Sequence, residues 1–188
     1  ISIKEYWDLD FTRGIVNRNF HEAKKQLADL MKKTVSLHMI SDVPVGILLS
    51  GGVDSTALLN YAVTETDKQI STFTVGFKSQ QFADEREFAI LAAKKFGSKH
   101  YEISFGAEDF VKLLPKYVWH MEEPVCEPPA IALYYVSRLA SNYVKVLISG
   151  EGGDEAFAGY PNYRKYLWLE RIKAVLGPYS KYCAKLIM

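Results

Sequence analysis

The chain has 188 residues, of which 48% are hydrophobic and 24% charged, and its formal net charge is +1. This is the composition of one folded domain, and the near-neutral charge argues against a surface built to bind nucleic acid or a membrane. Cys126 and Cys183 form no CxxC or Cys/His pattern, and no segment is apolar enough to span a bilayer, so the composition favours a cytoplasmic protein over a disulfide scaffold, a zinc module or a membrane protein.

Two kinds of hydrophobic pattern alternate along most of the chain. Residues 1–17 show no steady period, and we expect a linker or arm there. From about Arg18 onward, apolar residues at helical spacing predict helices at about 18–41, 54–63, 84–96, 107–121, 130–142 and from 154 onward. Between them, continuous apolar runs predict strands at 43–50, 70–77, 99–105 and 143–149.

Glycines and prolines mark where these elements should end. Gly97 is placed to stop the helix before it, Pro115 should interrupt the fourth helix, and Pro161 is a candidate break in the last one. Residues 122–129 hold three prolines and should be extended, because a proline disfavours the α region for the residue before it. Strands that alternate with helices in this way predict an α/β fold, an open parallel sheet flanked by helices.

The string SGGVDS follows the first predicted strand and opens a helix. In an open α/β sheet, ligands bind at the carboxyl ends of the strands. Gly51 and Gly52 let the backbone turn closely around an anion, while Ser50 and Ser55 add hydroxyl donors beside a helix N-terminus. This arrangement predicts a nucleotide-phosphate loop. The alternative is an ordinary Gly-Gly turn capped by Asp54 and Ser55.

Asp54 is the unusual member of this loop. A carboxylate repels a polyphosphate unless a cation lies between them, and Mg²⁺ is typically held by one or two carboxylates together with phosphate oxygens. The Walker pattern G-x-x-x-x-G-K-[ST] and the dinucleotide pattern G-x-G-x-x-G are both absent from the sequence. The loop also lacks the lysine of a γ-phosphoryl transfer site, so it predicts a nucleotide-phosphate and Mg²⁺ site of another kind.

A second glycine-rich turn, SGEGGDEAFAGY, follows the last predicted strand. It begins at Ser149 and Gly150 and places three carboxylates within five positions, where like charges need a cation or raise one another's pKa. We expect Asp154 to complete the magnesium site begun by Asp54, and Glu151 to face the reacting carbonyl. The alternative is a solvated acidic turn in which Asp154 caps a helix.

Four motifs carry a resemblance to a known family. The first loop resembles that of the PP-loop ATP pyrophosphatases, whose fold is adenine nucleotide α-hydrolase-like. The second loop is similar to that of the glutamine-dependent asparagine synthetases, as are the D-V-P from Asp42, the F-x-V-G-F from Phe73 and the YWDL from Tyr6. The resemblance covers nearly the whole chain, and it implies that ATP is cleaved between its α and β phosphates while the first loop grips the pyrophosphate.

The resemblance also implies roles for individual residues. Asp54 and Asp154 match the magnesium carboxylates, Glu151 matches a glutamate at the reacting centre, and these three are the expected catalytic residues. The expected ATP-binding residues match the loop and the backbone around adenine and ribose: Leu48, Ser50, Gly51, Gly52, Asp54, Ser55, Val75, Ser149 and Gly150.

The implied reaction is ATP-dependent asparagine synthesis. The side-chain carboxylate of aspartate attacks the α-phosphorus to give β-aspartyl-AMP and pyrophosphate, and ammonia derived from glutamine then releases AMP. A glutaminase domain of the same polypeptide is expected to supply the ammonia, and a homodimer is one option for the assembly. Two alternatives stay open: a related enzyme that amidates or cyclises another carboxylate, as in β-lactam synthetases or polysaccharide amidation, and a non-catalytic nucleotide-binding module.

Departures from the family pattern shape the expected domain organisation. No cysteine matches the nucleophile of the glutaminase domain, a phosphate-contacting lysine of the family falls beyond the last residue, and a Pro-Ala-Ile-Ala run from Pro129 stands where many relatives have Ser-Ala-Ile-Pro. We therefore expect residues 1–17 to be a linker from a missing N-terminal glutaminase domain. Residues 18–188 should be a C-terminally truncated synthetase domain that alone makes little or no asparagine. Lys78 and Arg86 are further candidates for phosphate contact.

Overall fold

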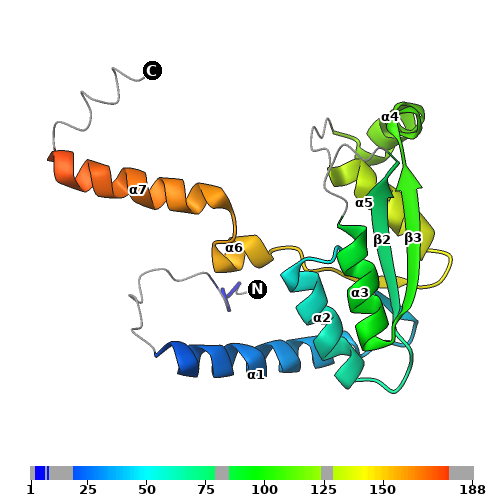
Figure 1. Cartoon of the computed structure of the whole chain (residues 1–188), viewed down its shortest axis with the longest axis horizontal. Helices are drawn as coiled ribbons and strands as arrows, with labels where there is room; N and C mark the ends of the chain where they lie inside the picture. Colours follow the sequence, from blue (N-terminus) through cyan, green and yellow to red (C-terminus); the bar gives the residue numbers. More distant parts are fainter. Residues whose placement is uncertain (1–2, 7, 9–18, 79–84, 124–128, 178–188) are drawn as a thin grey trace.

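The computed structural model describes residues 3–6, 8, 19–78, 85–123 and 129–177. At its centre is a parallel sheet in the order β3-β2-β1-β4 (Figure 1). Its strands are β1 (Val45–Leu48), β2 (Ser71–Phe77), β3 (Lys99–Phe105) and β4 (Val146–Ile148). The helices are α1 (Phe20–His38), α2 (Val53–Thr64), α3 (Arg86–Phe96), α4 (Ala107–Met121), α5 (Pro129–Ala140), α6 (Gly153–Phe157) and α7 (Pro161–Leu176). The predicted α/β fold with an open parallel sheet is confirmed.

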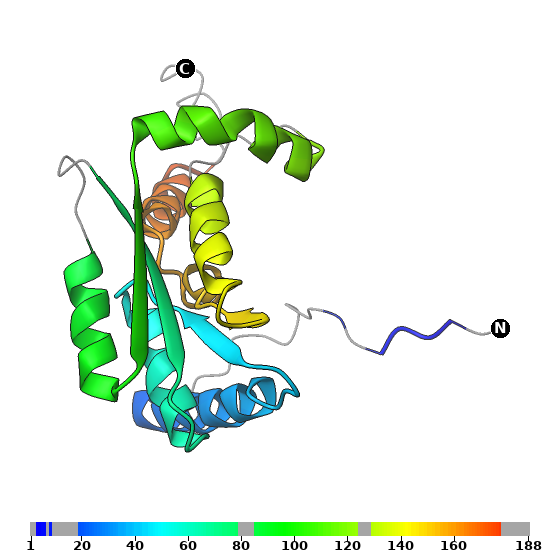
Figure 2. The ribbon, with the colours of Figure 1, turned by 90° about the vertical axis from the view of Figure 1, so that its right-hand side faces the viewer.

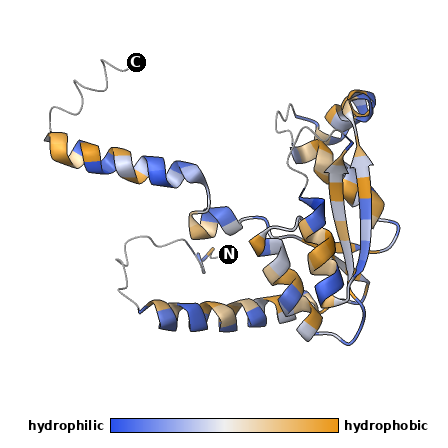
Figure 3. Cartoon of the chain, in the orientation of Figure 1, coloured by the Kyte–Doolittle hydropathy of each residue, from blue (hydrophilic) through white to orange (hydrophobic). Residues whose placement is uncertain are grey.

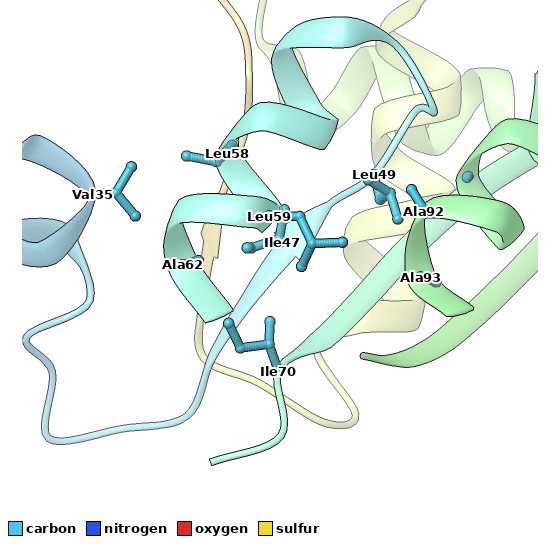
Figure 4. Close-up of a cluster of buried hydrophobic side chains, with 10 residues drawn as sticks. Val35, Ile47, Leu49, Leu58, Leu59, Ala62, Ile70, Ala92 and Ala93 are labelled. Carbon is cyan, nitrogen blue, oxygen red and sulfur yellow. The ribbon is translucent and has the colours of Figure 1, made fainter. Parts of the chain in front are cut away.

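Helices cover both faces of the sheet, which explains why the central strand β1 is apolar throughout (Figure 2). On one face, α2 packs against β1, α3 packs against β2 and β3, and α1 packs against α2. Ile47 and Leu59 belong to the buried cluster that these elements share (Figure 4). On the other face, α5 packs against β2, where Phe73 meets Val136 and Ala140. Each large side chain buried in this way contributes about 1.5–3 kcal/mol, so the sheet and its two helical layers form the stable platform of the site.

The predicted element boundaries agree with the structure at two of the three punctuating residues. Gly97 ends α3 in the left-handed conformation at φ 67°, and α7 begins at Pro161. The prediction at Pro115 is wrong, because α4 continues through it. A proline removes one backbone hydrogen bond, and Val111, whose carbonyl would accept that bond, is 67% exposed, so water can replace it. Strands β1 and β4 are shorter than the apolar runs that predicted them.

Two helices bury few of their residues. Val35 is the one buried residue of α1, and none is buried in α7, which extends away from the sheet (Figure 1). Hydrophobic residues nevertheless occur along α7 (Figure 3), and the large side chains of Leu167 and Trp168 are exposed. None of the helices within the described residues is both long enough and apolar enough to cross a membrane. The predicted linker at 1–17 and the extended segment at 122–129 fall largely outside the described residues.

Candidate functional site

The two glycine-rich loops lie side by side because β1 and β4 are parallel neighbours. Ile47 pairs with Ile148, so the loop that follows each strand emerges at the same edge of the sheet. From the sequence we expect the second loop to follow a neighbouring or nearby strand. The strand order shows that the two strands are adjacent. This edge is where open α/β sheets bind ligands.

The first loop is held to β2, the neighbour of the strand that precedes the loop. The Leu49 amide donates to the Phe73 carbonyl at 2.9 Å, and the buried hydroxyl of Thr74 donates to the Leu49 carbonyl. Both backbone groups of the last residue before the loop are therefore fixed by β2. The sequence did not predict a role for Thr74, because it is the variable position of F-x-V-G-F. A hydroxyl within a buried strand was the feature that could have indicated one.

Hydrogen bonds within the first loop fix its turn. Gly51 has φ +86°, a conformation that L side chains rarely adopt. The Ser50 and Ser55 hydroxyls lie 3.0 Å apart, and the Gly52 amide donates to the Ser50 hydroxyl at 3.2 Å. Gly52 is the N-cap of α2, and no side chain makes a cap hydrogen bond there. The Ser55 hydroxyl donates to the Gly52 carbonyl at 3.2 Å. The start of α2 thus has the form of an anion-binding helix N-terminus, and the choice between a phosphate loop and a turn capped by Asp54 and Ser55 stays a prediction.

The second loop touches Asp54 directly. A Cβ at Gly153 would lie 2.7 Å from Cγ and 2.8 Å from Oδ2 of Asp54, and a Cβ at Gly150 would lie 3.2 Å from the Asp54 Cβ. Cβ atoms essentially never approach as closely as the Gly153 distances and seldom as closely as the Gly150 distance, so a side chain at either position would displace Asp54. The carboxylate of the first loop thus lies against the residue that precedes Asp154.

The Asp154 carboxylate turns toward the end of α6. Its Oδ1 occupies the space that a Cβ at Gly159 would fill, and α6 has no side-chain cap, so Asp154 does not cap the helix. The Tyr160 hydroxyl donates to Glu155 at 2.7 Å, and this hydrogen bond raises the pKa of Tyr160 to about 12. Within the described residues, no group of three or more His, Cys, Asp or Glu side chains is arranged to hold a metal. The predicted joint action of Asp54 and Asp154 on one metal stays a prediction.

The two candidate phosphate cations are engaged elsewhere. Lys78 Nζ lies 2.7 Å from the Asp109 carboxylate, whose hydrogen bond raises the pKa of Lys78. Arg86 Nη1 donates to the Ser104 hydroxyl at 2.6 Å. Neither residue was predicted to have these partners, because pairs 31 and 18 residues apart carry no local sequence signal.

A cavity of about 780 Å³ opens beside the second loop. Asp54, Ser149 and Glu151 line its loop end, while apolar side chains of α1, α2 and α6 form most of its remaining wall. The remaining predicted nucleotide residues, Leu48 and Val75, are partly buried against the cluster around Phe73, which leaves their backbones at the carboxyl ends of β1 and β2.

Comparison with known proteins gives a consistent family assignment. Residues 26–185 match the family model of asparagine synthase. Asparagine synthetase [glutamine-hydrolyzing] 1 of Bacillus subtilis is 37% identical over 93% of this chain and 27% of its own length. Asparagine synthetase B of Escherichia coli is 28% identical over 97% of this chain and 36% of its own length. Amidase chyE of Penicillium rubens is 28% identical over 89% of this chain and 27% of its own length. The chain therefore spans between 27% and 36% of the length of these relatives.

Solved structures with a similar arrangement include two NAD synthetases. A glutamine-dependent enzyme from Acinetobacter baumannii, in complex with ADP, has a TM-score of 0.48 at 17% identity, over 80% of this chain and 29% of that one. An NH3-dependent enzyme from Campylobacter jejuni has a TM-score of 0.47 at 14% identity, over 76% of this chain and 61% of that one.

Proposed function

The chain belongs to the asparagine synthase family, and from this we infer that it binds ATP and Mg²⁺ and forms the acyl-AMP from which an amide is made. The observation that carries the proposal is the contact of Asp54 with Gly153, which joins the two loops at the edge of the sheet. A single phosphate loop would bind many nucleotides. Two loops in contact provide groups for both the pyrophosphate and the reacting centre.

In the proposed mechanism, the first loop holds the departing pyrophosphate. The amides at the start of α2 and the hydroxyls of Ser50 and Ser55 face its negative charge. The backbones at Leu48, Val75 and Gly150 would contact adenine or ribose. The acceptor carboxylate attacks the α-phosphorus, and the bond to the bridging oxygen breaks as pyrophosphate leaves.

Asp54 and Asp154 are of the residue type that a magnesium ion shared with the substrate would require, and Asp154 would have to turn from Gly159 toward Asp54 to hold it. Asp54 and Asp154 would supply two carboxylates and the phosphates the remaining oxygens, which is the usual mode of binding for this metal. When bound, Mg²⁺ would neutralise the charge that develops on the pyrophosphate. Glu151 lines the loop end of the cavity and would hold or accept a proton as ammonia attacks the acyl carbon.

The remaining roles follow the family. Aspartate is the proposed acceptor and glutamine the proposed source of ammonia, delivered by a glutaminase domain of the same polypeptide. Within this proposal, residues 1–17 link that domain to the synthetase domain at 18–188, and the chain tested alone makes little asparagine. A homodimer and a cytoplasmic location complete the proposal.

Pyrophosphate exchange tests this function. The protein produced from its complete reading frame is incubated with ATP, Mg²⁺ and labelled pyrophosphate, and candidate carboxylic acids are added one at a time. We expect exchange into ATP that depends on aspartate. Exchange with another acid would support the related enzymes that amidate or cyclise a different carboxylate, an alternative favoured by the Pro-Ala-Ile-Ala run from Pro129 and by the amidase among the relatives. ATP binding without any acid-dependent exchange would indicate a nucleotide-binding module.

A further inference from the structure

Arg86 spans the carboxyl ends of two neighbouring strands. Its side chain occupies the space that a Cβ at Gly76 would fill, and its Nη1 donates to the Ser104 hydroxyl at 2.6 Å. Gly76 and Ser104 are register partners in β2 and β3. One half-buried side chain therefore covers this pair, immediately after Val75, where the adenosine part of ATP is proposed to lie.

The helical turn that carries Arg86 also supports the first loop. A Cβ at Gly51 would lie 2.7 Å from the Ala89 amide nitrogen, 2.8 Å from the Phe88 Cβ and 2.9 Å from the Glu85 carbonyl oxygen. Ala89 is completely buried, so the turn is seated against the sheet. Gly51 thus rests on the backbone of this turn, and a shift of the turn would be transmitted to the loop.

We propose that Arg86 is a positioning residue of the nucleotide site and not a ligand of the phosphates. By attaching the first turn of α3 to the ends of β2 and β3, it fixes the strand end at Val75 and the support beneath Gly51. The inference rests on the proposed function, because the site that it positions is the proposed ATP site. It assigns to Arg86 a role that differs from the direct phosphate contact expected from its charge.

Hydrogen exchange tests the positioning role without any ligand. Arg86→Met removes the hydrogen bond to Ser104 but keeps an unbranched chain over Gly76, and Arg86→Lys keeps both a donor and length. Lys94→Met, an exposed position in the last turn of the same helix, is the matched control. We expect amide exchange in residues 50–55 and 75–78 to become at least about tenfold faster in Arg86→Met, to be partly restored in Arg86→Lys, and to be unchanged in Lys94→Met. Unchanged exchange in Arg86→Met would overturn the proposal.

Nucleotide binding to the same variants then separates positioning from phosphate contact. If Arg86 positions the whole site, Arg86→Met weakens the binding of AMP and of ATP by a similar factor, about tenfold. A loss confined to ATP, with AMP unaffected, would show that Arg86 contacts the β and γ phosphates and would overturn the proposal. If the unaltered protein bound neither nucleotide, the proposed function would fail, while the exchange rates would still decide whether Arg86 positions the loop.

Discussion

Replacing Gly153 with alanine should disturb Asp54 while leaving the backbone of α6 relaxed. Gly153 is the first residue of α6 and has no positive φ, so alanine is compatible with its conformation. By itself, Gly→Ala at such a site would stabilise the protein by about 0.4–1 kcal/mol. The added methyl, however, would lie 2.7 Å from Cγ and 2.8 Å from Oδ2 of Asp54, well inside normal contact distance. The two effects have opposite signs, which makes the substitution informative.

The size of the effect follows from how far the carboxylate must move. Ordinary van der Waals contact begins at 3.4 Å, so the Asp54 carboxylate must shift by more than half an ångström. Asp54 is exposed and can rotate, so most of the stability should be recovered. The position of the carboxylate as a metal ligand would not be recovered, because Mg²⁺ demands near-ideal octahedral geometry with bonds of about 2.0–2.1 Å. We expect the affinity for ATP with Mg²⁺ to fall by about tenfold to a hundredfold, as for other residues that orient a metal ligand.

A double-mutant cycle isolates this contact. Unfolding in urea is measured for the unaltered chain, Gly153→Ala, Asp54→Ala and the double variant, and calorimetry gives their affinity for ATP with and without Mg²⁺. In the Asp54→Ala background the methyl meets no carboxylate, so Gly153→Ala should be stabilising there and should leave binding unchanged. The coupling expected in the binding of ATP with Mg²⁺ is about 1.4–2.7 kcal/mol, which is the tenfold to hundredfold loss expressed as a free energy, and the coupling in the free energy of unfolding should be smaller. The reasoning is refuted if Gly153→Ala has the same effect on stability and on binding in both backgrounds.

Three further predictions concern other parts of the site and the sheet. Thr74→Val leaves the buried Leu49 carbonyl without its side-chain donor, so the free energy of unfolding should fall by about 1–3 kcal/mol in urea titrations; an unchanged midpoint would mean that the hydroxyl does not support the loop. Asp154→Asn keeps the shape of the side chain but removes its charge, so acid-dependent pyrophosphate exchange should drop at least about a hundredfold while circular dichroism stays the same, and full exchange would exclude Asp154 from the metal. Burial lowers the pKa of His100, whose Nδ1 lies 2.9 Å from a threonine hydroxyl, although Glu102 acts in the opposite direction. As the pH falls below about 6.5, the unfolded chain binds a proton at His100 that the folded chain does not, so the free energy of unfolding should decrease. It should become constant again below the folded-state pKa. His100→Asn should flatten this dependence of the urea midpoint on pH.

The sequence predicted the framework of the site because its signals are local. Glycines after apolar strands, the stop at Gly97 and the start at Pro161 all act through the backbone of a few residues, and the structure has each of them. The adjacency of β1 and β4 needed the strand order, which no local pattern specifies. At Pro115 the local pattern gave a wrong prediction. The expected break did not occur, because the helix is exposed to water there and continues through the proline.

Side-chain partners that lie far apart in the sequence were beyond prediction. Lys78 and Arg86 were chosen for their charge near a strand end, and the structure turns them toward Asp109 and Ser104. The contact between Asp54 and Gly153 likewise depends on two loops that are about a hundred residues apart. Charge and residue type suggested which groups carry chemistry, but only the packing of α3 and of the second loop decides what they meet.

The two loops differ in how strongly each is attached to the folded core. The first continues from a strand between two others into α2, whose buried residues belong to the main cluster. The second is joined to the sheet by the three residues of β4 and leads into α6, which buries none. Local opening is least costly where few apolar groups are buried, so thermal fluctuation should separate the second loop from the first before the sheet itself unfolds. A nucleotide that bridged both loops would lose part of its affinity to the entropy cost of ending that motion, and product release would begin with the same small detachment.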